Sequence, residues 1–229
     1  MAKTIPIYVG FDQTEAVAYH TFCQSVIERA SVPVSFHPLA LHNMKDYKEK
    51  HGDGSNEFIY SRFLVPYLHG YRGWAIFCDG DMVCQRDIND LWSLRDDKYA
   101  AMVVQHDYRT KYPVKYLGAR NDDYPRKNWS SVILFNCAHP GNRYLTPGYV
   151  ERTAGKVLHR LGWLLAGDVG ALPIEWNWLA GEYGQPTKPG IIHYTVGTPC
   201  FNEFKDFDLA DLWHQANRNM NHADQLPSG

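Results

Sequence analysis

The stretch Trp74-Ala75-Ile76-Phe77-Cys78-Asp79-Gly80-Asp81 decides the fold that we expect for this chain. Residues 74–78 are an apolar run, and a glycine-containing turn follows them. This pattern is typical of a buried central strand in an α/β sheet. Sheets of this kind bind ligands at the carboxyl ends of their strands. Two carboxylates at such a position are suited to hold a divalent cation together with the phosphates of a substrate.

The Asp79-Gly80 pair also fits a second interpretation. An Asp-Gly pair between two apolar runs is a signal for a two-residue β-hairpin, and the apolar run Met82-Val83-Cys84 follows directly. In a hairpin, both aspartate side chains would simply be solvated. The segment alone leaves both interpretations open.

Strand and helix patterns alternate on both sides of this segment, which favours one α/β domain with a mostly parallel, doubly wound central sheet. We place the main domain at residues 1–205, and a short C-terminal helix and flexible tail at residues 206–229. The other strands are predicted at residues 5–9, 34–39, 82–85, 100–105, 131–136 and 191–194, and the helices at 13–30, 57–68, 147–165 and 206–220.

The composition narrows the class of protein. The chain has 229 residues, of which 45% are hydrophobic and 21% are charged, as in an ordinary globular domain. The net charge of −2 and the lack of a basic tract give no support for a nucleic-acid partner. No signal-peptide core or membrane-spanning run is recognisable. The five cysteines are scattered without metal or redox spacing, so a reducing cytoplasm is the simplest location.

Candidate ligands follow several of the predicted strands. Asp12 follows the first strand, Asp79 and Asp81 follow a central strand, and His193 lies in the last strand. Two carboxylates and an imidazole suit a divalent ion such as Mn²⁺, with open positions left for phosphate oxygens. Taken singly, Asp12 is also explained as a helix cap, and His193 as a hydrogen-bonded core histidine.

Three segments together resemble a known family, the nucleotide-sugar glycosyltransferases of GT-A fold. The resemblance is strongest to the retaining group that is similar to glycogenin and to the bacterial lipooligosaccharide galactosyltransferases, and it covers about residues 5 to 200. The segments, one of which carries an Asp-x-Asp triplet, are Tyr60-Ser61-Arg62-Phe63-Leu64, Phe77-Cys78-Asp79-Gly80-Asp81-Met82-Val83 and Ile192-His193-Tyr194-Thr195-Val196-Gly197-Thr198-Pro199.

The resemblance implies a Rossmann-like GT-A domain and a hexosyltransferase activity. Such an enzyme moves a sugar from a nucleotide-diphosphate donor, with a UDP-sugar as the favoured donor, to a saccharide or another hydroxyl acceptor. Retention of the anomeric configuration is implied by the resemblance only. An inverting relative would need an acidic acceptor base, for which Asp168 and Glu175 are candidates.

Roles for single residues carry over by position. Asp79, Asp81 and His193 would hold Mn²⁺ or Mg²⁺ against the donor diphosphate, with Gly80 between the two aspartates. Arg62 would contact the diphosphate or orient Asp79. The remaining implied roles are a nucleoside pocket at Gly10, Phe11 and Asp12, a contact to the donor sugar from Asn136, an acidic group near the reacting sugar at Asp168, and close approach of backbone N–H groups to the β-phosphate at Gly197.

The turn after His193 departs from the family pattern. The family often has a lysine there, written His-x-x-Gly-x-x-Lys-Pro, which neutralises the leaving phosphate. Here no lysine precedes Pro199, so the source of the phosphate-side cation is open. Lys188 and Lys205 are near in sequence, although both are more typical of surface residues.

A long irregular segment at residues 106–129 is a candidate wall for the acceptor, because long loops in compact domains are often functional. Its aromatic residues are Tyr108, Tyr112, Tyr116, Tyr124 and Trp129, and its basic residues include Arg109, Lys111, Lys115 and Arg120. The other interpretation is a loop whose rings only pack on the domain. Further along the chain, we expect Asn177, between Trp176 and Trp178, to face the cleft.

Two other functions remain open on the sequence. A metal-dependent nucleotidyltransferase or phosphohydrolase also needs clustered carboxylates beside a phosphate. A catalytically impaired sugar-nucleotide-binding protein would keep the pocket without productive chemistry, and the missing lysine makes this a rival interpretation.

Overall fold

The computed structural model describes residues 4–52 and 56–221. Its central sheet has six strands in the order β2-β1-β3-β6-β5-β7. Strand β6 runs antiparallel to both of its neighbours, and all the other pairs are parallel. The predicted mostly parallel α/β sheet is therefore confirmed. The strands are β1 Ile5–Phe11, β2 Val34–Ala40, β3 Trp74–Cys78, β5 Ala101–Val104, β6 Val132–Asn136 and β7 Val169–Leu172.

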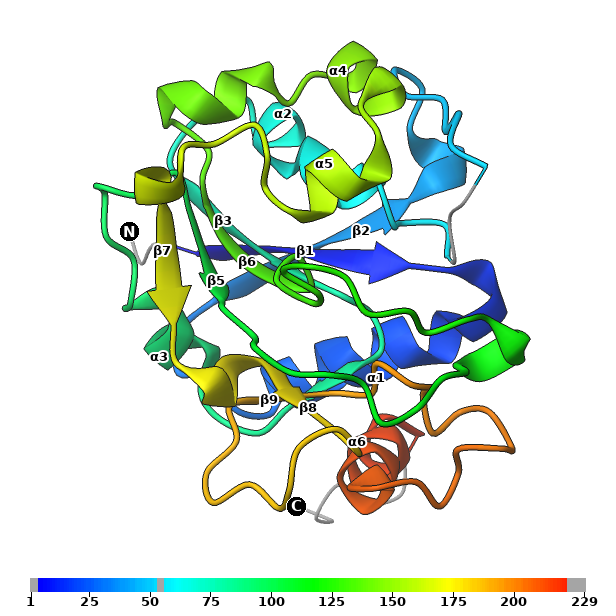
Figure 1. Cartoon of the computed structure of the whole chain (residues 1–229). Coiled ribbons are helices and arrows are strands. Elements are labelled where there is room, and N and C mark those ends of the chain that lie inside the picture. Colours follow the sequence, from blue (N-terminus) through cyan, green and yellow to red (C-terminus); the bar gives the residue numbers. More distant parts are fainter. Residues whose placement is uncertain (1–3, 53–55, 222–229) are drawn as a thin grey trace.

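Helices cover both faces of this sheet (Figure 1). The helices α1 (Ala16–Ile27) and α3 (Ile88–Trp92) lie on one face. The helices α2 (Val65–Leu68), α4 (Pro147–Arg152) and α5 (Gly155–His159) lie on the other. Successive residues of β3 point to opposite faces, so Ile76 joins the core cluster of α1 and Phe77 the core cluster of α2. The sheet is doubly wound, as predicted.

A second sheet of three strands lies beside the first, in the order β4-β9-β8. Its strands are β4 Met82–Cys84, β8 Trp178–Leu179 and β9 Ile191–His193. The C-terminal helix α6 (Ala210–Asn221) packs Trp213 and Ala216 into the core of this sheet. The predicted tail at residues 222–229 lies outside the described residues, and the boundary at residue 205 stays a prediction.

The Asp79-Gly80-Asp81 turn joins the two sheets and does not close a hairpin. Strand β3 pairs with β1 and β6, whereas β4 pairs with β9. A Cβ atom on Gly80 would lie 2.5 Å from the carbonyl oxygen of Gly10, so only glycine fits here. The hairpin interpretation is therefore wrong, and the turn brings both carboxylates to the edge where β1 and β3 end.

Several helical segments are shorter than the sequence pattern predicted. The segment at 57–68 forms only a 3₁₀ turn and the four-residue helix α2, and the segment at 147–165 is divided into α4 and α5 by extended backbone at Thr153 and Ala154. The short 3₁₀ helices are η1 Gln13–Glu15, η2 Leu41–Asn43, η3 Ser61–Leu64, η4 Tyr116–Gly118, η5 Pro140–Tyr144, η6 Ala166–Asp168 and η7 Ile174–Asn177. Strand β7 was not predicted, because Gly170 weakens the strand pattern in the sequence. In the structure, the ring of Tyr99 covers this glycine.

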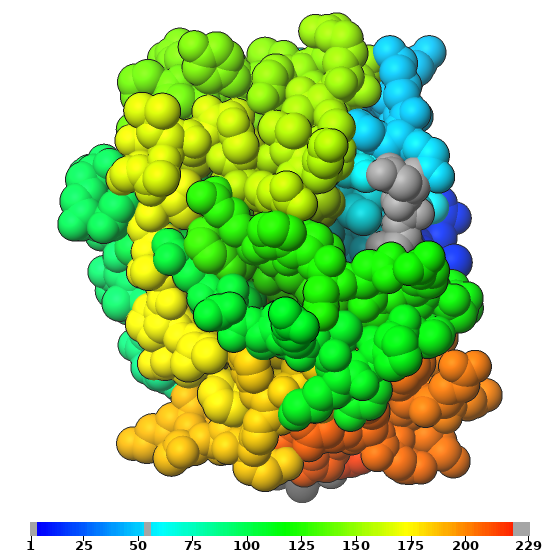
Figure 2. Space-filling view, in the orientation of Figure 1, coloured from blue at the N-terminus to red at the C-terminus, as the bar shows by residue number. Residues whose placement is uncertain are grey.

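The segment at residues 106–129 is held in place by side-chain hydrogen bonds rather than by regular structure. The Asn121 amide donates to Thr110 Oγ1 and to the carbonyl of Tyr112, each at 2.8 Å, and Asn121 Oδ1 accepts from Lys127 Nζ at 2.7 Å. Figure 2 shows this segment, in green, spread across the front of the molecule. Among the described residues, no helix has the length and apolar character needed to cross a membrane.

Candidate active site

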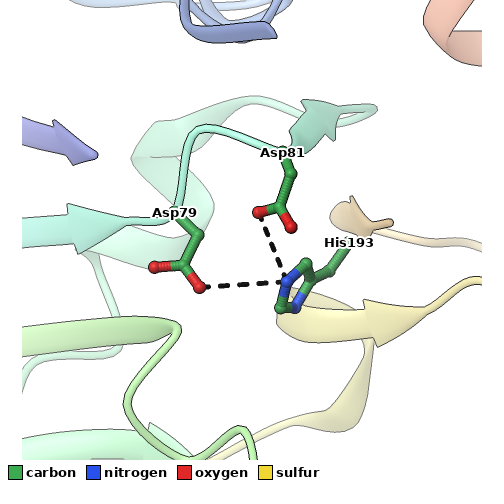
Figure 3. A group of neighbouring side chains, drawn as sticks. All are labelled: Asp79, Asp81 and His193. Atoms are coloured by element: carbon green, nitrogen blue, oxygen red, sulfur yellow. Dashed lines mark ion pairs between the residues drawn. The ribbon is translucent and has the colours of Figure 1, made fainter. Parts of the chain in front are cut away.

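The two sheets meet where Asp79, Asp81 and His193 converge (Figure 3). Asp79 follows β3, Asp81 precedes β4, and His193 ends β9, which pairs with β4 so that Met82 lies opposite His193. His193 Nε2 lies 3.4 Å from Asp81 Oδ1 and 3.8 Å from Asp79 Oδ2. One ligand atom from each of the three residues lies within 4.8 Å of the others, a spacing that small adjustments would fit to one ion.

Asn177 determines how the imidazole of His193 faces the carboxylates. The Asn177 amide donates to Ser131 Oγ at 2.8 Å and to the carbonyl of Asn128 at 3.2 Å, which leaves Asn177 Oδ1 as an acceptor. Oδ1 lies 3.0 Å from His193 Nδ1, so Nδ1 is the protonated nitrogen. The lone pair of Nε2 then points toward Asp79 and Asp81, the arrangement that metal-binding histidines use.

The two carboxylates are buried close together at an electrostatic cost. Burial raises the pKa of Asp79 to about 6, although attraction to Arg62 and His193 acts in the opposite direction. Burial would also raise the pKa of Asp81, but attraction to His193, when its imidazole carries both protons, outweighs the burial and leaves the pKa below its usual value. Asp81 Oδ1 is buried without a well-formed hydrogen bond. A divalent cation would offset this charge, so the donor set fits Mn²⁺ or Mg²⁺.

Arg62 holds Asp79 in position. Its Nη1 atom lies 2.7 Å from Asp79 Oδ1 and donates to the carbonyl of Ser130 at 3.0 Å. The guanidinium lies 5.3 Å from the ring centre of Phe58 and 5.1 Å from that of Phe77. Arg62 is only 4% exposed, and the fixed charge is therefore aimed at the carboxylate rather than at solvent.

A cavity of about 350 Å³ opens over these groups, within the size range of small-molecule sites. The segment at 106–129 forms one wall of it, and helix α5 forms another. Beyond Arg62 and the three candidate ligands, the charged and aromatic residues of the lining are Tyr60, Lys115, Tyr116, Arg120, Asp122, Tyr124, Lys127, Lys156, His159 and Arg160.

The aromatic residues predicted as an acceptor wall divide into two sets. Tyr116 and Tyr124 line the cavity. Tyr108 and Tyr112 instead pack on other rings, with ring centres 5.8 Å from Tyr183 and 5.5 Å from Phe207. The Trp129 indole donates to the carbonyl of His106 at 2.9 Å. Part of this loop therefore packs on the domain and part of it lines the cavity, and its role toward an acceptor stays a prediction.

The predicted nucleoside pocket lies at the end of β1, beside the end of β3, where Val9 pairs with Cys78. Asp12 acts as a cap, since one of its oxygens accepts from Thr14 N at 2.8 Å and the other accepts from Glu57 N at 3.1 Å. The role of Gly10, Phe11 and Asp12 toward a nucleoside stays a prediction.

Asn136 and Asp168 lie away from the site, so their predicted places are wrong. Because β6 runs antiparallel to β3, Asn136 lies opposite Trp74, at the end of β3 remote from Asp79. Asp168 precedes β7, and its carbonyl accepts from Ala100 N where β5 begins. The start of β6 is near the carboxylates instead, where Asp79 N donates to the carbonyl of Ser131 at 3.0 Å.

Gly197 does not present its backbone to the cavity, contrary to its predicted role. Its N–H donates to the carbonyl of Tyr194 at 3.0 Å, and a Cβ atom on Gly197 would lie 2.3 Å from the ring of Phe204. Glycine is therefore needed here for packing inside the turn. Lys188 and Lys205 are exposed, and Lys205 Nζ lies 3.9 Å from Asp206 Oδ2, as expected of surface residues.

Most of the sequence, including the residues of this site, is similar to known proteins. The family described as Glycosyl transferase family 8 matches residues 11–198. Protein CDI of Arabidopsis thaliana is 43% identical over 220 residues, a match that covers 92% of this chain and 85% of that protein.

Solved glycosyltransferases share the fold at low sequence identity. The galactosyltransferase LgtC, solved with donor and acceptor sugar analogs, has a TM-score of 0.62 at 14% identity, with 96% of this chain and 98% of LgtC covered. The bifunctional glycosyltransferase WbbM has a TM-score of 0.66 at 15% identity, and although 96% of this chain is covered, the chain spans only 50% of WbbM. The predicted GT-A fold is thereby confirmed.

Proposed function

The chain belongs to glycosyl transferase family 8, and on that premise we propose that it transfers a sugar from a nucleotide-diphosphate donor to a hydroxyl acceptor. A UDP-sugar is the favoured donor and a saccharide the favoured acceptor. The observation that carries the proposal is the buried group of Asp79, Asp81 and His193 at the base of a cavity of about 350 Å³. Clustered hard ligands in a concave site suit a metal-bound diphosphate.

Asp79, Asp81 and His193 would hold Mn²⁺ or Mg²⁺, which supplies positive charge to the oxygens of the donor diphosphate when bound. The residues of the chain prepare that position. Asn177 keeps His193 Nε2 facing the carboxylates, and Arg62 keeps Asp79 from rotating away. Because these groups are already in place, little reorganisation is needed when charge develops on the leaving phosphate.

Transfer with retention is the stereochemical outcome that the cavity favours. An inverting enzyme needs a carboxylate as base for the acceptor hydroxyl. Of the carboxylates in the described residues, the lining includes Asp122 besides the candidate metal ligands, and Asp122 accepts from Arg120 at 2.8 Å. Glu175 lies outside the cavity lining, with an oxygen 3.9 Å from Arg86. This distribution supports a mechanism without an acceptor base.

The test is a panel of UDP-, GDP- and TDP-sugars, each with Mn²⁺, Mg²⁺ or EDTA, in which released nucleoside diphosphate is measured with and without simple sugar acceptors. We expect one donor class to release its diphosphate only when metal is present. Release of sugar 1-phosphate or inorganic phosphate would favour a nucleotidyltransferase or phosphohydrolase. Donor binding without any release would favour a binding protein. Proton NMR of the product then determines the anomeric configuration.

A cytoplasmic location accords with the chemistry of the cysteines. All five are free thiols, and burial raises the pKa of Cys23 to about 12 and keeps that thiol protonated. Buried thiols that form no disulfides are typical of proteins from reducing compartments. Fractionation of cells that express the tagged protein would test this, and recovery with secretory vesicles would contradict it.

A further inference from the structure

The charge balance of the candidate site is incomplete once a donor is bound. The two carboxylates cancel the charge of a divalent ion, and Arg62 is paired with Asp79, so the diphosphate has to be offset by other cations of the cavity lining. In the transfer step, the bond between the anomeric carbon and the β-phosphate oxygen breaks, and its electron pair stays on that oxygen. The acceptor oxygen bonds to the anomeric carbon, and its proton leaves to solvent. The leaving group gains negative charge, so a further cation near it would stabilise the transition state.

Lys115 lies in the place where such a cation is needed. It lines the cavity together with Asp81 and His193. Its own N–H donates to the carbonyl of Ala119 at 2.7 Å, and the next residue, Tyr116, donates to the carbonyl of Val196 at 2.8 Å. The loop is therefore fastened to the turn that follows His193, the turn whose sequence contains no lysine.

Stacking strengthens this attachment. The ring of Tyr116 lies 5.3 Å from the ring of Phe201 in a nearly parallel arrangement. Leu117 and Gly118, at the tip of the loop, have φ angles of 56° and 72°, so the chain reverses tightly directly after Tyr116. The backbone of Lys115 is thus positioned by contacts on both sides, which limits the entropy lost when its side chain engages a ligand.

The Lys115 ammonium has no partner of its own among the described residues, where it forms neither a hydrogen bond nor an ion pair within 4 Å. Burial lowers its pKa, and attraction to Asp81 is the largest effect that opposes the burial. Two other cations of the lining are engaged, since Lys127 Nζ donates to Asn121 Oδ1 at 2.7 Å and Arg120 donates to Asp122. Lys156 and Arg160 also line the cavity, at the wall that α5 forms, whereas Lys115 is close enough to Asp81 to lower the pKa of that carboxyl. A partly buried, unpaired ammonium is costly to keep, and such groups are frequently functional.

We propose that Lys115 supplies the positive charge that neutralises the departing β-phosphate of the donor. This inference rests on the proposed glycosyl transfer. It makes Lys115 a catalytic residue from the segment at 106–129, in place of a lysine after the His193 turn.

The experiment compares the affinities for UDP and UMP by calorimetry with Mn²⁺ present, because only UDP has the β-phosphate. In Lys115→Met, we expect UDP to bind about tenfold more weakly or worse, and UMP to change less than about twofold. Lys115→Arg should keep most of the preference for UDP, since it keeps the charge. Lys205→Met is the matched control, because it removes an exposed lysine, and it should behave as the wild type.

The turnover number for transfer should fall about a hundredfold in Lys115→Met, the usual cost of one lost group that stabilises developing charge. Circular dichroism checks the fold, and Lys115→Gln replaces Lys115→Met if the latter does not fold. A UDP-to-UMP preference that is unchanged in these neutral variants would overturn the inference and leave the proposed function intact. The same titrations are run with GDP and GMP, and with TDP and TMP. A wild-type protein that binds none of the three diphosphates contradicts the proposed function, and the inference with it.

Discussion

The two ends of the β3–β6 pair both bury polar side chains, but they differ in how these groups are satisfied. At one end, the Asn142 amide donates to the carbonyls of Ala100 and Asn136, each at 2.8 Å, and its oxygen accepts from the Trp163 indole at 3.1 Å. At the other end, Asp79 and Asp81 lie close together, and Asp81 Oδ1 lacks a well-formed hydrogen bond.

This difference distinguishes a structural polar group from a functional one. A buried amide whose donors and acceptor are all paired stabilises the fold and has no capacity left for a ligand. A pair of buried carboxylates that repel each other costs stability and is retained where it binds something. Substitutions of the carboxylates should therefore lower activity more than stability, and substitution of Asn142 should lower stability more than activity. The following variants test this difference.

The largest effect is expected for Asp81→Ala. Loss of one carboxylate should weaken metal binding and lower the rate of transfer by about a thousandfold or more, equivalent to ~4 kcal/mol in the transition state. The melting temperature of the metal-free protein should change by only a few degrees, because the variant loses both the repulsion between Asp81 and Asp79 and the attraction between Asp81 and His193. Donor turnover with Mn²⁺ and thermal melting with EDTA are the two measurements. Near-normal turnover would contradict the assignment of Asp81.

The next effect is expected for Asn177→Ala, which removes the acceptor that orients His193. We expect the affinity for Mn²⁺, measured by titration with electron paramagnetic resonance, to fall about 10- to 100-fold. Asn136→Ala is the matched control, since it removes a buried asparagine at the opposite end of the sheet and should leave the affinity unchanged. Equal affinities in the two variants would show that the Asn177–His193 contact has no role in metal binding.

At the structural end, Asn142→Ala should lower stability and leave the chemistry alone. The variant leaves two carbonyls and an indole N–H without their partner, at a cost of ~2–3 kcal/mol. For a chain of this size, each kcal/mol corresponds to about 2–4 °C in melting temperature. The turnover number of the folded enzyme should equal that of the wild type. A variant with normal stability and impaired turnover would reverse the contrast between the two ends.

The smallest effect is expected for Glu15, near the carboxylates. Burial raises its pKa from 4.5 to about 8, with further contributions from Asp81, Asp12 and Asp79, while Thr198 donates to it at 2.8 Å. Between these two pH values the unfolded chain has released the proton that the folded chain still holds. Stability therefore falls as the pH rises from about 4.5 to about 8, and is constant above that.

Glu15→Gln removes this dependence. The variant should match the wild type near pH 4.5 and exceed its free energy of unfolding by roughly 1–2 kcal/mol at pH 8. This is less than the full shift would give at ~1.4 kcal/mol per pKa unit, because water reaches the ionised group after local relaxation. Urea unfolding with EDTA at both pH values measures the difference. An identical pH dependence in variant and wild type would show that Glu15 ionises normally in the folded protein.

Local patterns in the sequence predicted a large part of this arrangement. The apolar run of β3 ends at Asp79 in the structure as predicted, and His193 lies in the last strand of the chain. These predictions succeeded because burial, strand propensity and turn chemistry act over a few neighbouring residues, so that the sequence records them directly.

Other parts of the site depend on long-range pairing. The pattern of β6 is the same whichever way the strand runs, and only its pairing with β3 and β5 shows that Asn136 points away from the site. In the same way, the sequence pointed to Lys115 and Asn177 only as two of several polar residues near the cleft. Their positions come from the contact of Tyr116 with Val196 and of Asn177 with His193.

The sequence by itself determined the α/β class, the strand that carries Asp79 and the residue types able to bind a metal. Only the tertiary structure decided which of the candidate polar groups share one cavity. The physical reason is that a strand pattern reports burial, which is a local property, whereas strand direction and loop attachment depend on hydrogen bonds between residues that are distant along the chain.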